Sequence, residues 1–194
     1  EWHWDDMDDW ENWVVDYGFK KSRPAISLQY GLAEMSRTDI QSQFVDPALL
    51  ELKLGYIKER SAWQTDNIIK HSYKYLYLSN ESNKLAGKEA TGTEIESDMW
   101  RFGVGWSSGY GYKLGENSAI IPYYSYTLNW SNINFMYPDV LTLVPDSDLE
   151  KLNLYDESFR FGTSAEGGVR VKLIENLMLD AGYERSIVFQ RHLF

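Results

Sequence analysis

The stretch FRFGTSAEGGVRVKLIENLMLDAGYERSIVF, residues 159–189, decides the fold that this sequence predicts. Its side chains alternate with a period of two in two arms, which residues 174–176 separate. One face is apolar or small: Phe159, Phe161, Thr163, Ala165, Gly167, Val169, Val171 and Leu173, then Leu177, Leu179, Ala181, Tyr183, Ile187 and Phe189. The other face is charged, polar or glycine: Arg160, Gly162, Ser164, Glu166, Gly168, Arg170 and Lys172, then Asp180, Gly182, Glu184 and Ser186. This alternation predicts one long β-hairpin.

The length of the arms indicates their environment. Strands of soluble proteins usually run about five or six residues, whereas the first arm keeps its phase from 159 to 173. A tilted strand that crosses a bilayer needs roughly nine to eleven residues. The hairpin therefore favours a membrane-spanning β-barrel over a soluble sheet.

Composition excludes several classes of protein. The net charge of −10 argues against a nucleic-acid-binding surface, which would be basic. The chain has no cysteine, so it forms no disulfide, thiolate metal site or lipidated N-terminal cysteine. The mean hydropathy of −0.46 alone would suit a soluble protein, and no apolar run approaches the roughly eighteen residues of a membrane helix. Hydropathy is a poor test, however, because a membrane barrel shows only alternation.

Aromatic residues are abundant, with 14 Tyr, 8 Trp and 8 Phe. Membrane barrels need such residues for the aromatic girdles at their two water interfaces. The chain begins at Glu1 with neither Met nor a signal peptide. An exported protein whose signal peptide has been removed would begin in this way, and so would a trimmed chain.

Residues 1–19 differ from the rest of the chain. Apolar residues recur in this segment at spacings of three and four, among acidic residues. They are Trp2 and Met7, followed by the predicted apolar face of the helix, Trp10, Trp13, Val14 and Tyr17. This pattern predicts a short amphipathic helix, followed by a barrel over 22–194. The tryptophans suit a membrane interface, but anionic headgroups would repel the acidic face. Packing on the barrel rim or on a partner, and a poorly ordered acidic tail, are the alternatives.

Alternation with a period of two recurs over 26–32, 50–57, 69–78, 100–112 and 120–130. Over 69–78 the pattern leaves open which face points outward. In 100–112, Arg101 and four glycines share the face opposite the aromatic residues. Such a face gives a soluble sheet little to pack, but in a narrow barrel it makes room for large side chains. The predicted membrane-interface aromatics are Trp100, Trp106, Tyr110, Tyr112, Tyr124, Tyr126 and Trp130.

The sequence resembles small bacterial outer-membrane barrels of the OmpA-like type. Tight turns at 113–117 and 174–176 alternate with long polar loops at 79–97 and 132–157, as periplasmic turns and extracellular loops do in that class. Residues 167–183 also resemble the last hairpins of those barrels in style. The resemblance implies an all-β, antiparallel up-and-down transmembrane barrel, most often eight-stranded, in the bacterial outer membrane and in contact with its lipid and lipopolysaccharide.

Two features depart from that class. The alternation gives seven strands, whereas an even number is expected. An eighth strand would have to return after Phe189, either by splitting the last segment at 184–186 or from beyond a truncated end. The chain ends in Phe194, the type of residue that the insertion machinery reads, but Phe194 shares its parity with His192 rather than with Phe189.

If the apolar faces meet lipid, charged residues point into the lumen. A cation, Arg170 or Lys172, then lies opposite Asp180 in either of two registers. An unpaired buried ion costs several kcal/mol, so we expect a structural ion network rather than a selective pore or a catalytic site. An eight-stranded barrel is also just filled by its side chains. The predicted network comprises Arg101, Arg160, Glu166, Arg170, Lys172, Asp180 and Glu184, with Glu51 and Lys53 beside it.

The residues for catalysis are few. His3, His71 and His192 are the only histidines and none has metal-ligand spacing to another, so we assign no catalytic residue, metal or cofactor. Outer-membrane barrels include enzymes that transfer acyl chains to lipid A or remove them. The adjacent His71 and Ser72 would face opposite sides of a strand and could not serve one such site.

The sequence therefore predicts an integral outer-membrane barrel with a structural or interaction role. It would serve as a membrane anchor, as a display of surface loops, or as a subunit of an envelope assembly. A partner would bind the N-terminal helix or the loops 79–97 and 132–157. The alternatives are a lipid A-modifying enzyme, a narrow porin-like channel and a soluble lipocalin-like barrel. The lipocalin alternative would place the glycine face outside.

Overall fold

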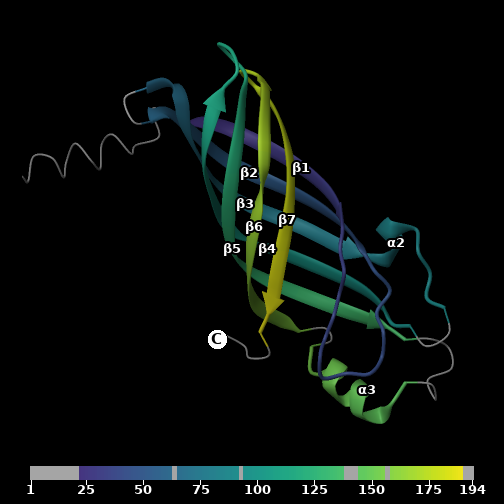
Figure 1. Ribbon diagram of the computed structural model, residues 1–194. Helices are drawn as coiled ribbons and strands as arrows, with labels where there is room; N and C mark the ends of the chain where they lie inside the picture. The colour runs from purple at the N-terminus through teal and green to yellow at the C-terminus, as the bar shows by residue number, and fades with distance from the viewer. Residues whose placement is uncertain (1–21, 63–64, 92–93, 138–143, 156–157, 190–194) are drawn as a thin grey trace, which may run out of the picture.

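A computed structural model describes residues 22–62, 65–91, 94–137, 144–155 and 158–189 of the chain. The described residues form seven strands and two short helices (Figure 1). The helices, α2 (Asn83–Ala86) and α3 (Asp146–Asn153), lie at one end of the sheet. Neither is long and apolar enough to cross a membrane. The strands are β1 (Arg23–Leu32), β2 (Ala48–Ala62), β3 (Thr65–Ser82), β4 (Glu96–Lys113), β5 (Ala119–Met136), β6 (Phe159–Ile174) and β7 (Leu177–Val188).

Each strand pairs antiparallel with the next, in the order β1-β2-β3-β4-β5-β6-β7, and the sheet curls into an incomplete barrel (Figure 1). This confirms the predicted all-β, up-and-down arrangement. The described residues supply seven strands rather than the eight expected, with β1 and β7 at the edges. The helix predicted for residues 1–19 and Phe194 lie outside the described residues.

Strands β1 to β5 all extend beyond the stretches in which alternation predicted them, and β3 and β5 extend into the predicted loops. β3 continues to Ser82 and β5 to Met136, so the loops predicted at 79–97 and 132–157 are shorter. The end of β3 was predicted as a loop because the residues of this strand that face the lumen are polar. Ser79 and Glu81 are buried on the inward face, where a polar side chain does not mark a loop.

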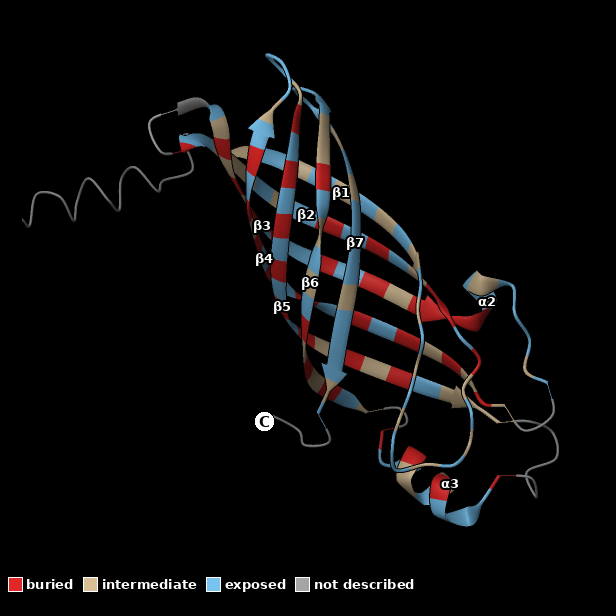
Figure 2. Cartoon of the chain, viewed as in Figure 1, coloured by how far each residue is buried: buried red, intermediate tan, exposed pale blue. Residues whose placement is uncertain are grey.

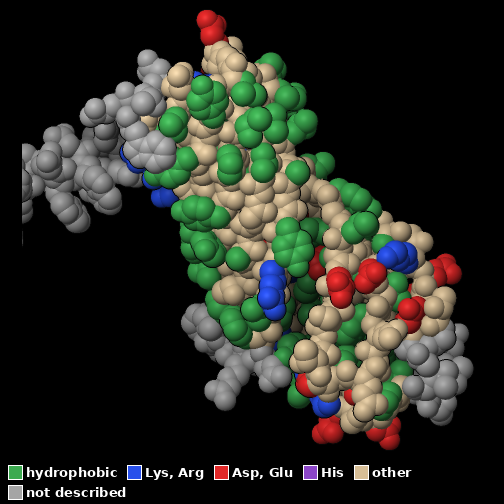
Figure 3. Space-filling view, in the orientation of Figure 1, with side chains coloured by type: hydrophobic (Ala, Val, Ile, Leu, Met, Phe, Trp, Pro, Cys, Tyr) green, Lys and Arg blue, Asp and Glu red, His purple; other side chains and the backbone are tan. Residues whose placement is uncertain are grey.

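Burial alternates along the central strands, and the apolar face is the exposed one (Figure 2). In β4 the outward tryptophans Trp100 and Trp106 are 49% and 42% exposed, while inward Arg101 is 1% exposed. Figure 3 shows hydrophobic side chains over the barrel wall, while most acidic side chains of this face gather beside the loops. The exterior is therefore apolar and the interior polar.

The three long connections, 33–47, 83–95 and 137–158, share one end of the sheet, the loop end, while the tight connections share the turn end (Figure 1). The long connections pack on one another around Ile95, Val144 and Leu152, with Phe44 and Phe135 against this cluster. A short parallel bridge joins Phe44 to Ile95. We call these three packed connections the loop cap. Their contacts give the loop end a core of its own.

Candidate functional site

The inward face of the sheet carries a chain of ion pairs, and its first group lies at the turn end. Glu59 of β2 accepts hydrogen bonds from Arg23 of β1 and Lys172 of β6, each at 2.6 Å from Oε2. Strand alternation points these side chains inward, and the curl of the sheet brings β1 and β6 to the same carboxylate. Sequence analysis missed Glu59 and Arg23, although both share the inward parity of their strands.

The second group is centred on Arg170. Its guanidinium donates to both carboxylate oxygens of Asp180, at 2.8 and 2.7 Å, and to Nδ1 of His71 at 3.0 Å. Arg170 and Asp180 are direct partners across β6 and β7, the first of the two registers that the sequence allowed. Because a guanidinium only donates, Nδ1 of His71 is the acceptor and its ring proton lies on Nε2.

Lys53 holds the middle of the lumen. Its ammonium lies 2.9 Å from Glu51 and 3.2 Å from Glu166, and it donates to Gln29 Oε1 at 2.7 Å. Glu166 also accepts a 2.5 Å hydrogen bond from the hydroxyl of Tyr123. This group links β1, β2, β5 and β6 across the barrel.

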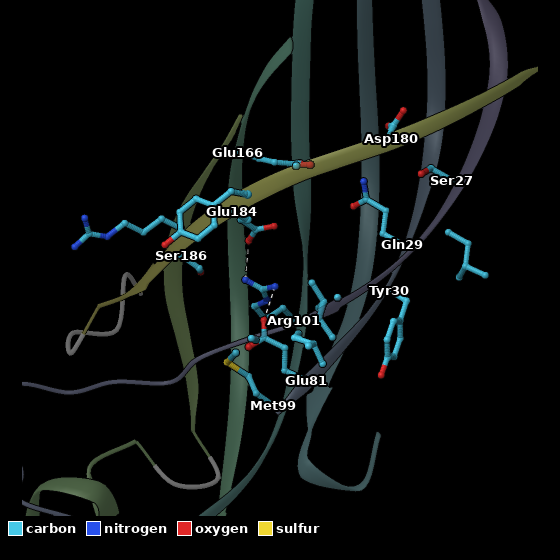
Figure 4. Close-up of a pocket in the computed structure, with 18 of the residues that line it drawn as sticks. Ser27, Gln29, Tyr30, Glu81, Met99, Arg101, Glu166, Asp180, Glu184 and Ser186 are labelled. Atoms are coloured by element: carbon cyan, nitrogen blue, oxygen red, sulfur yellow. Dashed lines mark hydrogen bonds and ion pairs between the residues drawn. The ribbon is translucent and has the colours of Figure 1, made fainter. Parts of the chain in front are cut away.

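Arg101 forms the group nearest the loop end (Figure 4). It lies 2.5 Å from Glu81 and 3.0 Å from Glu184, so one cation joins carboxylates of β3 and β7. Its Nε also donates to Ser79 at 3.2 Å. The pairing compensates the cost of burying the charge, which would be several kcal/mol for an isolated ion.

Arg160 differs from the other predicted members of the network. It points inward but lies at the loop end, where it donates to the carbonyl oxygen of Leu154 and lies 5.4 Å from the ring centroid of Tyr155. The structure therefore brings the other six predicted residues into ion pairs within the lumen and places Arg160 against the loop cap.

A row of tyrosines fills the space between these groups. Tyr73, Tyr75 and Tyr77 of β3 are buried, with neighbouring ring centroids 4.8 and 6.3 Å apart. The Tyr75 hydroxyl lies 2.7 Å from the Ser125 hydroxyl on β5, so this side chain spans the inward face of β4 at Gly105. This settles the open question of 69–78, since the tyrosines point inward and Leu76 and Leu78 point outward.

The predicted interface aromatics all lie on the outward faces of β4 and β5. Toward the loop end, Trp130 stacks on Phe102 with ring centroids 5.9 Å apart, and Trp100 is near them in β4. Tyr110, Tyr112 and Tyr124 lie toward the turn end. Tyr110 follows Trp100 by ten positions, about 33 Å along a strand, and a typical tilt reduces this to the apolar height of about 25 Å of a membrane barrel. Trp106 and Tyr126 pair with each other between the two groups.

The described residues offer little for catalysis or metal binding. His71 is completely buried and points inward, while Ser72 belongs to the opposite face of β3. His71 contacts a cation rather than the carboxylate that would orient a general base. Nowhere in the described ranges do three or more His, Asp or Glu side chains gather as potential metal ligands.

Comparison with known proteins gives one match. The family model described as outer membrane protein beta-barrel domain matches residues 18–191, which include all seven strands. No curated protein and no solved structure shows significant similarity to the chain.

Proposed function

This chain belongs to the outer membrane protein β-barrel domain family. Within that family, we propose that it is a structural and interaction protein with a closed lumen. The barrel anchors the chain in the outer membrane. The loop cap is the part that it presents to partners in the envelope or at the surface.

The observation that carries this proposal is the set of contacts that cross the lumen. Lys53 on β2 reaches Glu166 on β6, and Arg101 on β4 reaches Glu184 on β7. Contacts of this kind obstruct the path of hydrated ions along a narrow barrel. In the part of the chain that the structure describes, the lumen cations Lys53, Arg101, Arg170 and Lys172 each pair with a carboxylate of the barrel itself. The same contacts favour an anchor over a channel.

The loop cap supports the interaction role. Asp148 of α3 accepts hydrogen bonds from the backbone N–H groups of Gln41 and Ser42, at 2.8 and 2.9 Å, and thereby joins two long connections. Leu85 and Leu154 remain exposed at this end, at 38% and 60%. Loops that are fixed in one arrangement suit protein recognition better than solvated loops do, because less conformational freedom is lost on binding.

Electrical recording on the purified protein tests the closed lumen. We expect no stepwise conductance from the wild-type protein in planar bilayers. A variant with Tyr73→Ala, Tyr75→Ala and Tyr77→Ala should conduct, provided that it keeps heat-modifiable gel mobility. Leu76→Ala with Leu78→Ala is the matched control, because it shortens two outward side chains of the same strand. Steady wild-type conductance, or release or transfer of acyl chains on lipid A, would refute the proposal.

The interaction role needs its own experiment. Replacing α3, residues 146–153, by a flexible linker of equal length should abolish cross-linking to envelope proteins, while membrane insertion and heat-modifiable mobility remain. Wild-type protein and the Leu76→Ala variant serve as references. Unchanged cross-linking after this replacement would contradict a role for the loop cap in recognition.

A further inference from the structure

Four cations interrupt the apolar exterior, and they lie together on the outward face of the hairpin that β2 and β3 form near the turn end (Figure 1). We call this set the basic patch, and its members are Lys58, Arg60, Lys70 and Lys74. Arg60 and Lys74 are exposed, while Lys58 and Lys70 are half-buried. Because the whole chain carries a net charge of −10, its overall composition does not account for this concentration of positive charge.

The register of the sheet brings these cations side by side. Arg60 pairs directly with Lys70. Lys58 pairs with Ser72, so Lys70 and Lys74 are its diagonal neighbours on the same face. Direct partners have their Cβ atoms about 5 Å apart, and diagonal neighbours are about 7–8 Å apart. Like charges directly opposite each other destabilise a sheet, so an anion held between them would stabilise this one.

The described barrel wall around the basic patch does not supply that anion. The outward faces of β1 and β2, and that of β3 over 67–82, contain no Asp or Glu. The acid nearest in sequence, Glu59, points into the lumen, where it accepts hydrogen bonds from Arg23 and Lys172. These faces therefore leave the basic patch with a net positive charge.

The basic patch lies at the depth of the aromatic residues of the turn end. Lys70 pairs with Tyr110 of β4, and its Nζ lies 5.3 Å from the centroid of the tyrosine ring. Lys74 pairs with Trp106 and lies four residues, or about 13 Å, further along the strand from the turn end. A lysine at this depth extends its aliphatic stem toward the interface. The charged groups therefore lie at the level of lipid headgroups, where aromatic belts also lie.

Beyond the basic patch, toward the middle of the membrane, the outward face of the same two strands becomes apolar. Leu54 pairs with Leu76 and Leu52 pairs with Leu78, and these four side chains are 38–63% exposed. A phospholipid has the same order of groups, because its acyl chains follow a headgroup that carries a phosphate. The two strands therefore match one lipid molecule along their length in both charge and polarity.

We propose that the basic patch binds the phosphate of an anionic glycerophospholipid, whose acyl chains lie along Leu54 and Leu76. Arg60 and Lys70 hold the phosphate between them, since a guanidinium donates two parallel hydrogen bonds and an ammonium adds a point charge. The tight turns of bacterial outer-membrane barrels face the periplasm, and the leaflet on that side consists of glycerophospholipid rather than lipopolysaccharide. The site rests on the proposed membrane anchor and gives that anchor a preference for one class of lipid.

Native mass spectrometry of the detergent-solubilised protein, titrated with one lipid at a time, tests the proposal. Phosphatidylglycerol should bind about tenfold more tightly than zwitterionic phosphatidylcholine. The double variant Arg60→Gln with Lys70→Gln should lose most of this preference. Arg185→Gln with Lys88→Gln is the matched control, because it removes two positive charges outside the basic patch, and it should keep the preference.

Unfolding by urea in lipid vesicles gives a second measurement, because the paired like charges cost stability until lipid binds. In phosphatidylcholine vesicles, Arg60→Gln should unfold at a higher urea concentration than the wild-type protein. In vesicles that contain phosphatidylglycerol, this order should reverse. Heat-modifiable mobility verifies that each variant is folded. Neither measurement depends on conductance or acyl transfer, so this proposal and the closed lumen can fail separately.

Several results would overturn the proposal. Equal affinity of the double variant and the wild-type protein for phosphatidylglycerol would show that the basic patch does not bind the headgroup. Tighter binding of lipid A than of phosphatidylglycerol would assign the site to the other leaflet. Displacement of phosphatidylglycerol by inorganic pyrophosphate would indicate a site for free phosphate rather than for a lipid. The same order of unfolding in both kinds of vesicle would exclude a stabilising anion between Arg60 and Lys70.

Discussion

The ring of Tyr75 occupies the space that a side chain at position 105 would need. Tyr75 and Gly105 are direct partners across β3 and β4, and a Cβ on Gly105 would lie 2.4 Å from Cζ of the ring. Tyr77 pairs with Gly103 and His71 with Gly109 in the same register, but a Cβ at these two glycines would first meet residues of β5. At Gly105, the absence of a side chain therefore makes room for the ring of Tyr75.

Gly105→Ala should destabilise the barrel by about 1–3 kcal/mol, because the Tyr75 ring must move and its hydrogen bond to Ser125 is strained. Urea unfolding in lipid vesicles measures the change. Gly167→Ala is the control, since a Cβ there meets no atom within 4 Å, and it should be neutral or slightly stabilising. Equal effects at the two glycines would contradict this account.

Arg101→Met should cost roughly 3–5 kcal/mol of unfolding free energy, because it leaves Glu81 and Glu184 without their shared cation. Adding Glu81→Gln and Glu184→Gln should recover much of the loss. A double-mutant cycle on the unfolding free energy checks the coupling. A single variant as unstable as the triple variant would show that packing, not charge, makes Arg101 important.

A charge placed on the outward face should lower the free energy of unfolding, and it should do so more strongly the deeper it lies in the membrane. Val104 lies in the middle of β4 and pairs with Leu128, so Val104→Arg should cost about 2–4 kcal/mol. Leu173→Arg, near the turn end of β6, should cost only about 0–1 kcal/mol. Unfolding in vesicles measures both values, and the reverse order would exclude the proposed placement of the bilayer.

The loop cap should open in acid. Burial raises the pKa of Asp148, but hydrogen bonds from Gln41 and Ser42 lower it by more, so the pKa lies below its ordinary value. A lowered pKa means that this carboxylate stabilises the cap fully above about pH 4 and loses that effect as the pH falls through the lowered pKa.

Hydrogen exchange at the Gln41 and Ser42 amides, corrected for the intrinsic pH dependence, measures the opening of the cap. In the wild-type protein, protection should begin to fall near the ordinary pKa of about 3.9 and should continue to fall as the pH is lowered further. Asp148→Asn should flatten this dependence and lower protection at pH 7. Asp146→Asn, on the exposed side of the same helix, is the control and should change neither. Protection that does not vary with pH in the wild-type protein would argue against the role of Asp148.

Alternation alone predicted every strand of the sheet and the inward or outward side of most of its residues. It failed to orient 69–78, where Tyr73, Tyr75 and Tyr77 alternate with lysine and leucine. Tyrosine suits both lipid and a crowded lumen, and only the pairing of β3 with the glycines of β4 decides between them. The extent of β3 was also underestimated, because Ser79 and Glu81 look like loop residues until their burial is known.

The sequence by itself determined the class of fold, the seven described strands and the placement of charge inside and apolar residues outside. These features are local, because the backbone of a strand turns successive side chains to opposite faces. Tertiary structure decided which ions meet. Lys53 reaches Glu166 and Lys172 reaches Glu59 across 113 positions of the chain. Those contacts depend on the curl and register of the whole sheet, which no single stretch of sequence specifies.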